Sequence, residues 1–224
     1  MAPGSTLVMH FHFVTLFPDS FGSYFNESIL KRSIEDKKIK VSFYNPRDFT
    51  KDKHARVDRS PYGGGPGMVI QAEPVIKAIE KARGKKKDVK IIFLSPRGKQ
   101  FSNEYAENLA KKFKHIIFVC GRYEGIDARV RQVFSRNIDE ISIGPFVLTG
   151  GELPAMLITD VVARQVEGVL GNVDSIEERR VAGKDVYTRP EVFTYKGKKY
   201  AVPKILLSGH HKNIEDWRKS LRKS

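Results

Sequence analysis

The sequence contains a single cysteine, Cys120, and none of its apolar runs approaches the roughly 20 residues that a membrane-spanning helix needs. One cysteine excludes a disulfide-stabilised scaffold and a cysteine-rich zinc module. The segment from Met1 to Phe17 lacks the basic start of a signal peptide, and Met9 is a candidate first residue with residues 1–8 as an extension. We therefore expect a cytoplasmic protein that does not enter a membrane.

Acidic residues are scarce relative to basic ones. The chain of 224 residues has 26 Asp and Glu against 40 Lys and Arg, which gives a net charge of +14. Thirteen of the basic residues but only four of the acidic ones lie between residues 179 and 224. Such an excess predicts a polyanionic partner, nucleic acid ahead of an anionic membrane surface. On charge alone, a solvated basic surface without a partner stays open.

Several signatures of enzyme sites are also missing. The sequence has no G-x-x-x-x-G-K-[ST] loop for nucleotide phosphates, no strand-linked G-x-G-x-x-G for a dinucleotide and no G-x-S-x-G nucleophile elbow. The six histidines include two close pairs, His10 with His12 and His210 with His211. Neither pair has neighbours that complete a ligand set, so the sequence predicts no metal site.

Up to about residue 171, strand-like and helix-like stretches alternate. Short apolar runs rich in β-branched and aromatic residues predict strands, and apolar positions at helical spacing predict helices between them. The predicted strands are 10–15, 39–44, 89–94, 115–119 and 138–143, and the predicted helices are 74–83, 102–113 and 153–169. This alternation predicts an α/β fold with a mainly parallel sheet, followed by a short, basic, mainly helical C-terminal segment.

Four segments are too rich in glycine and proline to be simple turns, and three of them directly follow a predicted strand. They are Tyr62–Met68, Leu94–Gly98, Cys120–Gly125 and Ile143–Pro154. Strand-end loops are the usual ligand sites of α/β proteins. Loops of bare backbone and small residues suit a planar heterocycle and a ribose. Together with the basic flank, they predict a nucleoside cofactor beside a nucleic-acid substrate.

At these residues the chain closely resembles the bacterial tRNA (guanine-N1)-methyltransferases of the TrmD type. The resemblance runs from about Met9 to Arg222 and rests on the order and spacing of eight motifs, each weak by itself. They are PRDFT from Pro46, YGGGPGM from Tyr62, LSPRG from Leu94, CGRYEGID from Cys120, SIGPFVLTGGELPAM from Ser142, GVLG from Gly168, YTRPE from Tyr187 and LLSGH from Leu206.

The resemblance implies a SPOUT methyltransferase, whose parallel sheet carries a deep trefoil knot around the cofactor, against the general rule that chains are unknotted. It implies transfer of the methyl group of S-adenosylmethionine to N1 of guanosine 37 of tRNA by a homodimer with its active site between subunits. Magnesium is associated with the reaction, although the sequence offers no dedicated cage of carboxylates for it. The implied domains are a methyltransferase domain at 9–171, a linker at 172–186 and an abbreviated tRNA-binding domain at 187–224.

The resemblance also assigns individual residues. The catalytic residues are Arg164, which faces the guanine O6, and a carboxylate base considered below. Tyr62, Gly64, Tyr123 and Glu124 are expected at the substrate, with a structural cap as the alternative role of Glu124 and an Asp160–Arg164 surface pair as that of Arg164. The expected cofactor-binding residues are Leu94, Ser95, Pro96, Gly121, Ile143, Gly144, Pro145, Phe146, Val147, Leu148, Gly150, Gly151 and Pro154.

Two departures from the family pattern bear on catalysis. Phe146 stands where the family often has Tyr, which keeps the ring and removes a hydroxyl. Arg179 falls at the position of the proposed aspartate base, and because an arginine cannot accept a proton we expect Glu178 to act instead, with Glu177 and Asp174 as fallbacks. The alternative is a non-catalytic RNA-binding relative that has lost its base. A SPOUT enzyme that methylates a ribose hydroxyl is disfavoured by YGGGPGM and YTRPE.

Overall fold

The computed structural model describes residues 8–170 and 185–220 of the chain. The chain divides between Leu170 and Gly171 into two compact units, and each is described by itself. None of the helices in the described ranges is both long and apolar enough to cross a membrane.

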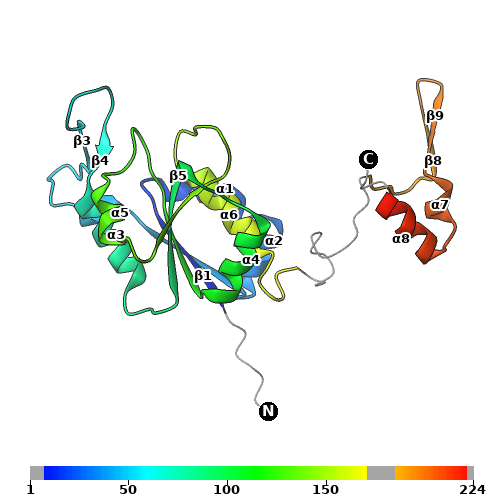
Figure 1. Cartoon of the computed structure of the whole chain (residues 1–224), viewed down its shortest axis with the longest axis horizontal. Coiled ribbons are helices and arrows are strands. Elements are labelled where there is room, and N and C mark those ends of the chain that lie inside the picture. The colour runs from blue at the N-terminus through cyan, green and yellow to red at the C-terminus, as the bar shows by residue number, and fades with distance from the viewer. Residues whose placement is uncertain (1–7, 171–184, 221–224) are drawn as a thin grey trace, which may run out of the picture. The chain divides into compact units, whose positions relative to one another are not determined.

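Five parallel strands form the centre of the first unit, in the order β2-β1-β6-β5-β7 (Figure 1). They are β1 Met9–Val14, β2 Ile39–Tyr44, β5 Val89–Gln100, β6 His115–Val119 and β7 Ile138–Ser142. The predicted α/β fold with a parallel sheet is therefore confirmed. Apart from the end of β5, each strand begins and ends within one residue of the prediction.

Strand β5 continues past the predicted end at Leu94, but its pairing is interrupted. Leu94 and Lys99 both pair with Ile141 of β7, so residues 95–98 leave the sheet and return to the same place. A Cβ on Gly98 would lie 2.5 Å from the backbone N of Ile141, which explains why glycine stands there. The predicted loop is thus an excursion within a strand, because β7 pairs with both of its ends.

Helices cover both faces of the sheet (Figure 1). One face carries η1 Pro18–Phe21, α1 Gly22–Phe25, α2 Ser28–Glu35, α4 Asn103–Lys112 and α6 Glu152–Ala163. The other carries α3 Ala72–Arg83 and α5 Arg129–Val133. The short η2 Pro46–Phe49 and the two-stranded antiparallel pair of β3 Asp58–Arg59 and β4 Val69–Ile70 complete the unit.

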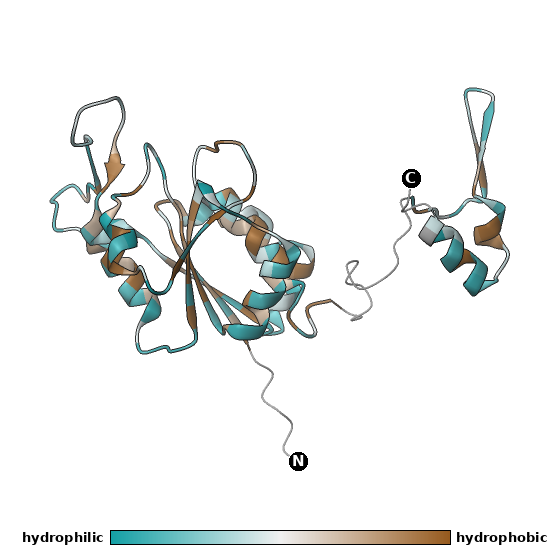
Figure 2. Cartoon of the chain, in the orientation of Figure 1, coloured by the Kyte–Doolittle hydropathy of each residue, from teal (hydrophilic) through white to brown (hydrophobic). Residues whose placement is uncertain are grey.

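Alternation along the strands builds two hydrophobic clusters, one on each face of the sheet. In β1, Phe11 and Phe13 pack under α1, α2 and α6, while Val14 faces the side of α3. Helix α4 begins as the sequence predicts, since the Ser102 hydroxyl accepts a hydrogen bond from the Tyr105 N–H at 3.2 Å. Figure 2 shows mainly apolar residues along the central strands, which is typical of parallel sheets covered on both faces.

Helix α6 is shorter than predicted. The apolar spacing predicts a helix to Val169, but the helix ends at Ala163. Beyond it, the N–H groups of Gln165 and Val166 bond three residues back, and Gly168 adopts a positive φ of 79°. Because these tighter turns also carry apolar residues at nearly helical spacing, the periodicity of the sequence does not show where the α-helix ends.

The described part of the second unit begins at residue 185 and contains a hairpin that the prediction of a mainly helical segment missed. Strands β8 Val192–Tyr195 and β9 Lys198–Ala201 pair antiparallel, and α7 Lys204–Leu207 and α8 His211–Ser220 follow. Lys196 and Gly197 at the tip both have positive φ, 49° and 77°, as a two-residue hairpin turn requires. None of the side chains described between residues 185 and 220 is buried.

Candidate functional site

A cavity of about 390 Å³ lies at the carboxyl ends of β5, β6 and β7. Three loop segments line it, at 93–97, 121–126 and 140–151, together with the start of α6. This is the edge at which parallel α/β sheets bind their ligands, because loops from neighbouring strands converge there.

The structure brings together nearly all the residues expected to bind the cofactor. Of that set, Pro145 alone does not line the cavity. Tyr123 and Glu124, expected at the substrate, line the same cavity, whereas Tyr62 and Gly64 do not. Tyr62 is fully exposed. The lining residues from the expected cofactor set are Leu94, Ser95, Pro96, Gly121, Ile143, Gly144, Phe146, Val147, Leu148, Gly150, Gly151 and Pro154.

A hydroxyl beneath the loop after β7 fixes its first turn. The buried Ser142 Oγ accepts a hydrogen bond from the Gly144 N–H at 3.2 Å and donates one to the Gly144 carbonyl at 3.0 Å. A Cβ on Gly144 would collide with the ring of Phe146. Glycine at this position therefore lets the half-exposed Phe146 ring lie back over the cavity wall.

The end of the same loop runs past the segment that follows β6. The Gly151 N–H donates to the Gly121 carbonyl at 2.9 Å, and Gly150 forms an antiparallel bridge with Arg122. A Cβ on Gly151 would lie 2.7 Å from the Cα of Cys120. Gly151 is thus required for the close approach of two backbones rather than for a turn, whereas a Cβ on Gly150 would meet the side chains of Arg122 and Glu152.

An ion pair that the sequence analysis did not single out lies under this crossing. Arg122 Nε is 2.9 Å from Glu152 Oε2, although its N–H does not point along a good hydrogen-bond direction. The hydroxyl of Thr15, at the end of β1, donates to Glu152 Oε1 at 2.8 Å. Arg122 Nη1 donates to the Thr149 carbonyl at 3.3 Å, and the guanidinium carbon lies 4.5 Å from the centre of the Phe17 ring.

Arg122 and Glu152 both occur in the quoted motifs, but they lie 30 positions apart. No local spacing indicates that they pair, because the contact depends on the crossing of the two loops. The adjacent Cys120 thiol is buried, and burial, with the nearby charge of Glu152, raises its pKa well above the ordinary value. Cys120 is therefore a packed thiol at neutral pH and not a nucleophile.

Glu124 at the rim of the cavity is held by the glycine-rich loop of residues 62–68. Its N–H donates to the Met68 carbonyl at 3.0 Å, and a Cβ on Gly67 would lie 2.6 Å from Glu124 Oε1. Tyr62 and Gly64 are farther out on this loop. Gly67 and Met68 are thus the residues of this loop that contact Glu124. The sequence does not distinguish them, because every glycine in the run indicates the same conformational freedom.

Of the two predicted catalytic residues, the structure describes Arg164 alone. Arg164 is half-buried at the C-terminal cap of α6 and does not line the cavity, whereas Gly151 and Pro154 at the other end of that helix do. A helix of 12 residues is about 18 Å long. Arg164 has no ion pair with Asp160 among the described residues. Glu178, Glu177, Asp174 and Arg179 lie outside the described residues.

Known proteins resemble the chain along nearly its whole length. The family model described as tRNA (Guanine-1)-methyltransferase TrmD matches residues 9–224. A tRNA (guanine-N(1)-)-methyltransferase of Dictyoglomus turgidum is 49% identical over 92% of this chain and 82% of its own length. The enzyme of the same name from Campylobacter jejuni subsp. doylei is 45% identical over 95% and 92%, and that of Buchnera aphidicola is 42% identical over 94% and 88%. The chain belongs to the TrmD family of tRNA (guanine-N1)-methyltransferases.

Proposed function

We propose that the protein transfers the methyl group of S-adenosylmethionine to N1 of guanosine 37 of tRNA. The observation that carries the proposal is the cavity built from the strand-end loops of a chain that belongs to the TrmD family. Its volume lies in the range of small-molecule sites. The bound co-substrate supplies a methyl group on a positively charged sulfur, and the protein has to orient that group and prepare the guanine.

The cavity walls fit a nucleoside. The lining includes Gly121 and Gly144, which offer only backbone groups, and it includes the apolar residues Leu94, Phe146 and Leu148. Such a wall holds a purine by main-chain hydrogen bonds and apolar contact. The ion pair of Arg131 with Glu140, 2.6 Å between Nη1 and Oε2, neutralises two of the charged groups that line the cavity.

The knot expected for the family is part of this proposal. Its support is the crossing at which the segment after β7 runs past the segment after β6, joined by the Gly151–Gly121 hydrogen bond and the Arg122–Gly150 bridge. A crossing locked in this way keeps the cavity walls at a fixed distance, which lowers the ordering cost of binding.

Guanine N1 carries a proton that has to leave as the new bond to the methyl carbon forms, and negative charge then develops on O6. We propose that Arg164 stabilises that charge. Because Arg164 is at the far end of α6, we infer that it serves the cavity of a second copy of the chain in a homodimer. Leu153 and Leu157, which are 56% and 40% exposed one turn apart on α6, support a covered helix face.

Magnesium does not fit the described residues as a tightly held ion. Mg²⁺ prefers several oxygen ligands in octahedral geometry. Residues 8–170 and 185–220 contain no group of three carboxylates close enough to share an ion, and Glu124 is the one unpaired carboxylate at the cavity. We assign no step to magnesium.

The test is methyl transfer followed by nucleoside analysis. The protein is incubated with S-adenosylmethionine labelled in the methyl group and with a tRNA that has guanosines at positions 36 and 37, and the RNA is digested to nucleosides. Label in 1-methylguanosine, absent when position 37 is adenosine, supports the proposal. Label in a 2′-O-methylated nucleoside, or RNA binding without transfer, overturns it in favour of a ribose methyltransferase or a non-catalytic relative.

A further inference from the structure

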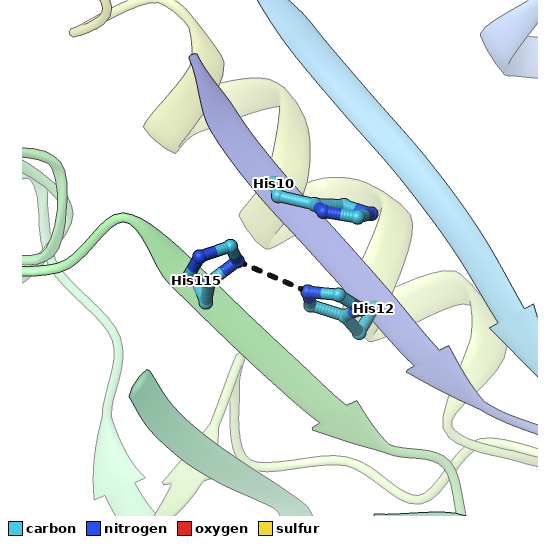
Figure 3. A group of neighbouring side chains, drawn as sticks. All are labelled: His10, His12 and His115. Carbon is cyan, nitrogen blue, oxygen red and sulfur yellow. Dashed lines mark hydrogen bonds between the residues drawn. The ribbon is translucent and has the colours of Figure 1, made fainter. Parts of the chain in front are cut away.

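Three histidines meet on one face of the central sheet (Figure 3). His10 and His12 stand two residues apart on β1, and His115 is the first residue of β6 and the register partner of His10. One ring nitrogen from each lies within 4.8 Å of the other two. His12 Nε2 and His115 Nδ1 are 3.3 Å apart, and the His10 and His12 rings lie 3.8 Å apart between centres.

The cluster is separate from the methyl-transfer cavity. His115 begins β6, whereas Gly121 follows the end of that strand and lines the cavity. Six residues of strand span about 20 Å. The three histidines therefore have no place in the proposed reaction.

We propose that His10, His12 and His115 bind one divalent transition-metal ion of the kind that prefers imidazole, with Zn²⁺ as the representative ion, and that the ion ties β1 to β6. In a tetrahedral zinc site with Zn–N bonds near 2.0–2.1 Å, ligand nitrogens lie about 3.3–3.4 Å apart. The nitrogens that join His12 to His115 by a hydrogen bond already have that separation, and an ion takes the place of this bond once the donor ring carries its proton on its other nitrogen. One ring nitrogen of the half-exposed His10 lies within 4.8 Å of both and completes the set.

Neighbouring hydroxyls on β2 hold the rings, as outer partners do in metal sites. Ser42 Oγ is 2.9 Å from His10 Nε2, and the Tyr44 hydroxyl is 3.1 Å from His12 Nδ1. Each of these contacts leaves the other nitrogen of its ring for an ion. Burial raises the pKa of Tyr44, so this group stays a phenol that can hydrogen-bond to the ring.

The electrostatics favour ligands in their neutral form. Burial, together with nearby positive charges, lowers the pKa of His10 to about 4 and that of His12 to about 3, and burial also lowers the pKa of His115. Neutral imidazole is the form that binds a metal. Apart from the histidines themselves, the charged groups that act on the cluster are Lys40 of β2, Lys86 after α3, and Asp88 and Lys114 ahead of β5 and β6.

The lysines oppose a cation but do not fill the site. Lys86 Nζ donates to the Ala82 carbonyl at 2.9 Å and so faces the negative end of helix α3. Lys40 is exposed, and Asp88 adds a negative charge. We therefore expect moderate affinity and a strong preference for ions that bind imidazole over Mg²⁺ and Ca²⁺.

The test is metal binding by the full chain after dialysis against a chelator. Titration calorimetry with zinc sulfate at pH 7.5 is expected to give one site per chain, with no heat from magnesium chloride. His115→Gln and His10→Gln remove half-buried ligands near the amino ends of β1 and β6 and are expected to weaken zinc binding by at least about tenfold. Urea unfolding of each variant checks that its fold is intact.

The matched control is the double variant His210→Gln, His211→Gln, because these two exposed histidines are adjacent and could capture zinc by themselves. This double variant is expected to bind zinc as the wild type does, and the same result is expected for His54→Gln. In the wild type, Co²⁺ is expected to give the visible absorption of a tetrahedral site, and His115→Gln is expected to lose it. The proposal is overturned if zinc binding survives in His115→Gln and His10→Gln, if it disappears in the His210/His211 variant, or if the wild type binds no zinc.

Discussion

Arg122 and Glu152 form an ion pair that joins the segment after β6 to the start of α6 beside the cavity, with 2.9 Å between Nε and Oε2 and the Glu152 side chain 4% exposed. Thr15 contributes a third contact from the end of β1. The segments that follow β1 and β6 are thereby tied to one carboxylate at the start of α6. The pair costs desolvation, so its role is to position the loops rather than to add net stability.

Removing one partner leaves the other charge buried. We expect Arg122→Ala to lower the free energy of unfolding by about 3–5 kcal/mol and to weaken S-adenosylmethionine binding, as measured by urea denaturation and calorimetry. Adding Glu152→Gln to the same chain should recover part of the stability. The exposed pair of Arg129 with Asp127 is the control, since Arg129→Ala should cost less than about 1 kcal/mol. Equal losses in the two alanine variants would contradict a positioning role.

Gly144→Val should abolish cofactor binding and leave the fold intact. The new side chain collides with the Phe146 ring and forces it toward the cavity. Calorimetry with S-adenosylmethionine and a thermal unfolding curve measure the two effects. Gly22→Val is the control, since its Cβ lies 3.4 Å from the Asn26 side chain and outside the cavity lining. Unchanged affinity in Gly144→Val means that the cofactor binds elsewhere.

Without metal, the protein should lose stability as the pH falls from about 6.5 toward 4. The folded-state pKa of His10 is about 4 and that of His12 about 3, against an ordinary value of 6.5, mainly because both rings are buried. The unfolded chain therefore takes up protons first, and each such histidine contributes a slope of up to about 1.4 kcal/mol per pH unit. Urea midpoints from pH 7 to 5 measure the slope, and His10→Gln should flatten it whereas His54→Gln should not.

The β8–β9 hairpin should carry part of the salt dependence of RNA binding. Lys196 and Lys198 are exposed and each lies 5.5 Å from the centre of a tyrosine ring, an arrangement that suits a phosphate beside a stacked base. Replacing both lysines by Gln should lower the slope of log K against log salt by roughly 0.7–0.9 for each lost phosphate contact. Lys77→Gln is the control on α3. An unchanged slope would show that the hairpin lysines do not contact RNA.

Glu178→Gln should lower the single-turnover rate of methyl transfer by about 10²–10⁴-fold, the usual contribution of a general base, with cofactor affinity unchanged. Arg179→Ala should instead mainly weaken RNA binding. Full activity in Glu178→Gln with loss in Glu177→Gln or Asp174→Asn would move the base to that residue. If none of the three matters, a carboxylate base is not used.

The parts of the fold that depend on local pattern could be predicted, and those that depend on distant partners could not. Strands β2 and β6 are found where runs of β-branched and aromatic residues indicate them. The excursion within β5 depends on β7, and the Arg122–Glu152 pair depends on the crossing of two loops. The position of His115 beside His10 depends on strand order, which no spacing along the chain reveals.

Strand order also sets when the sheet can form during synthesis. Strand β1 lies between β2 and β6. The edge of β1 that pairs with β2 can be covered soon after the two strands leave the ribosome. The edge that pairs with β6 stays unpaired until His115–Val119 has been made. At about 5–20 residues per second this interval is on the order of several seconds. Throughout it, a strand that carries Phe11 and Phe13 presents an unpaired edge. Nascent chains of this protein are therefore expected to be substrates for ribosome-associated chaperones until β6 pairs with the free edge of β1.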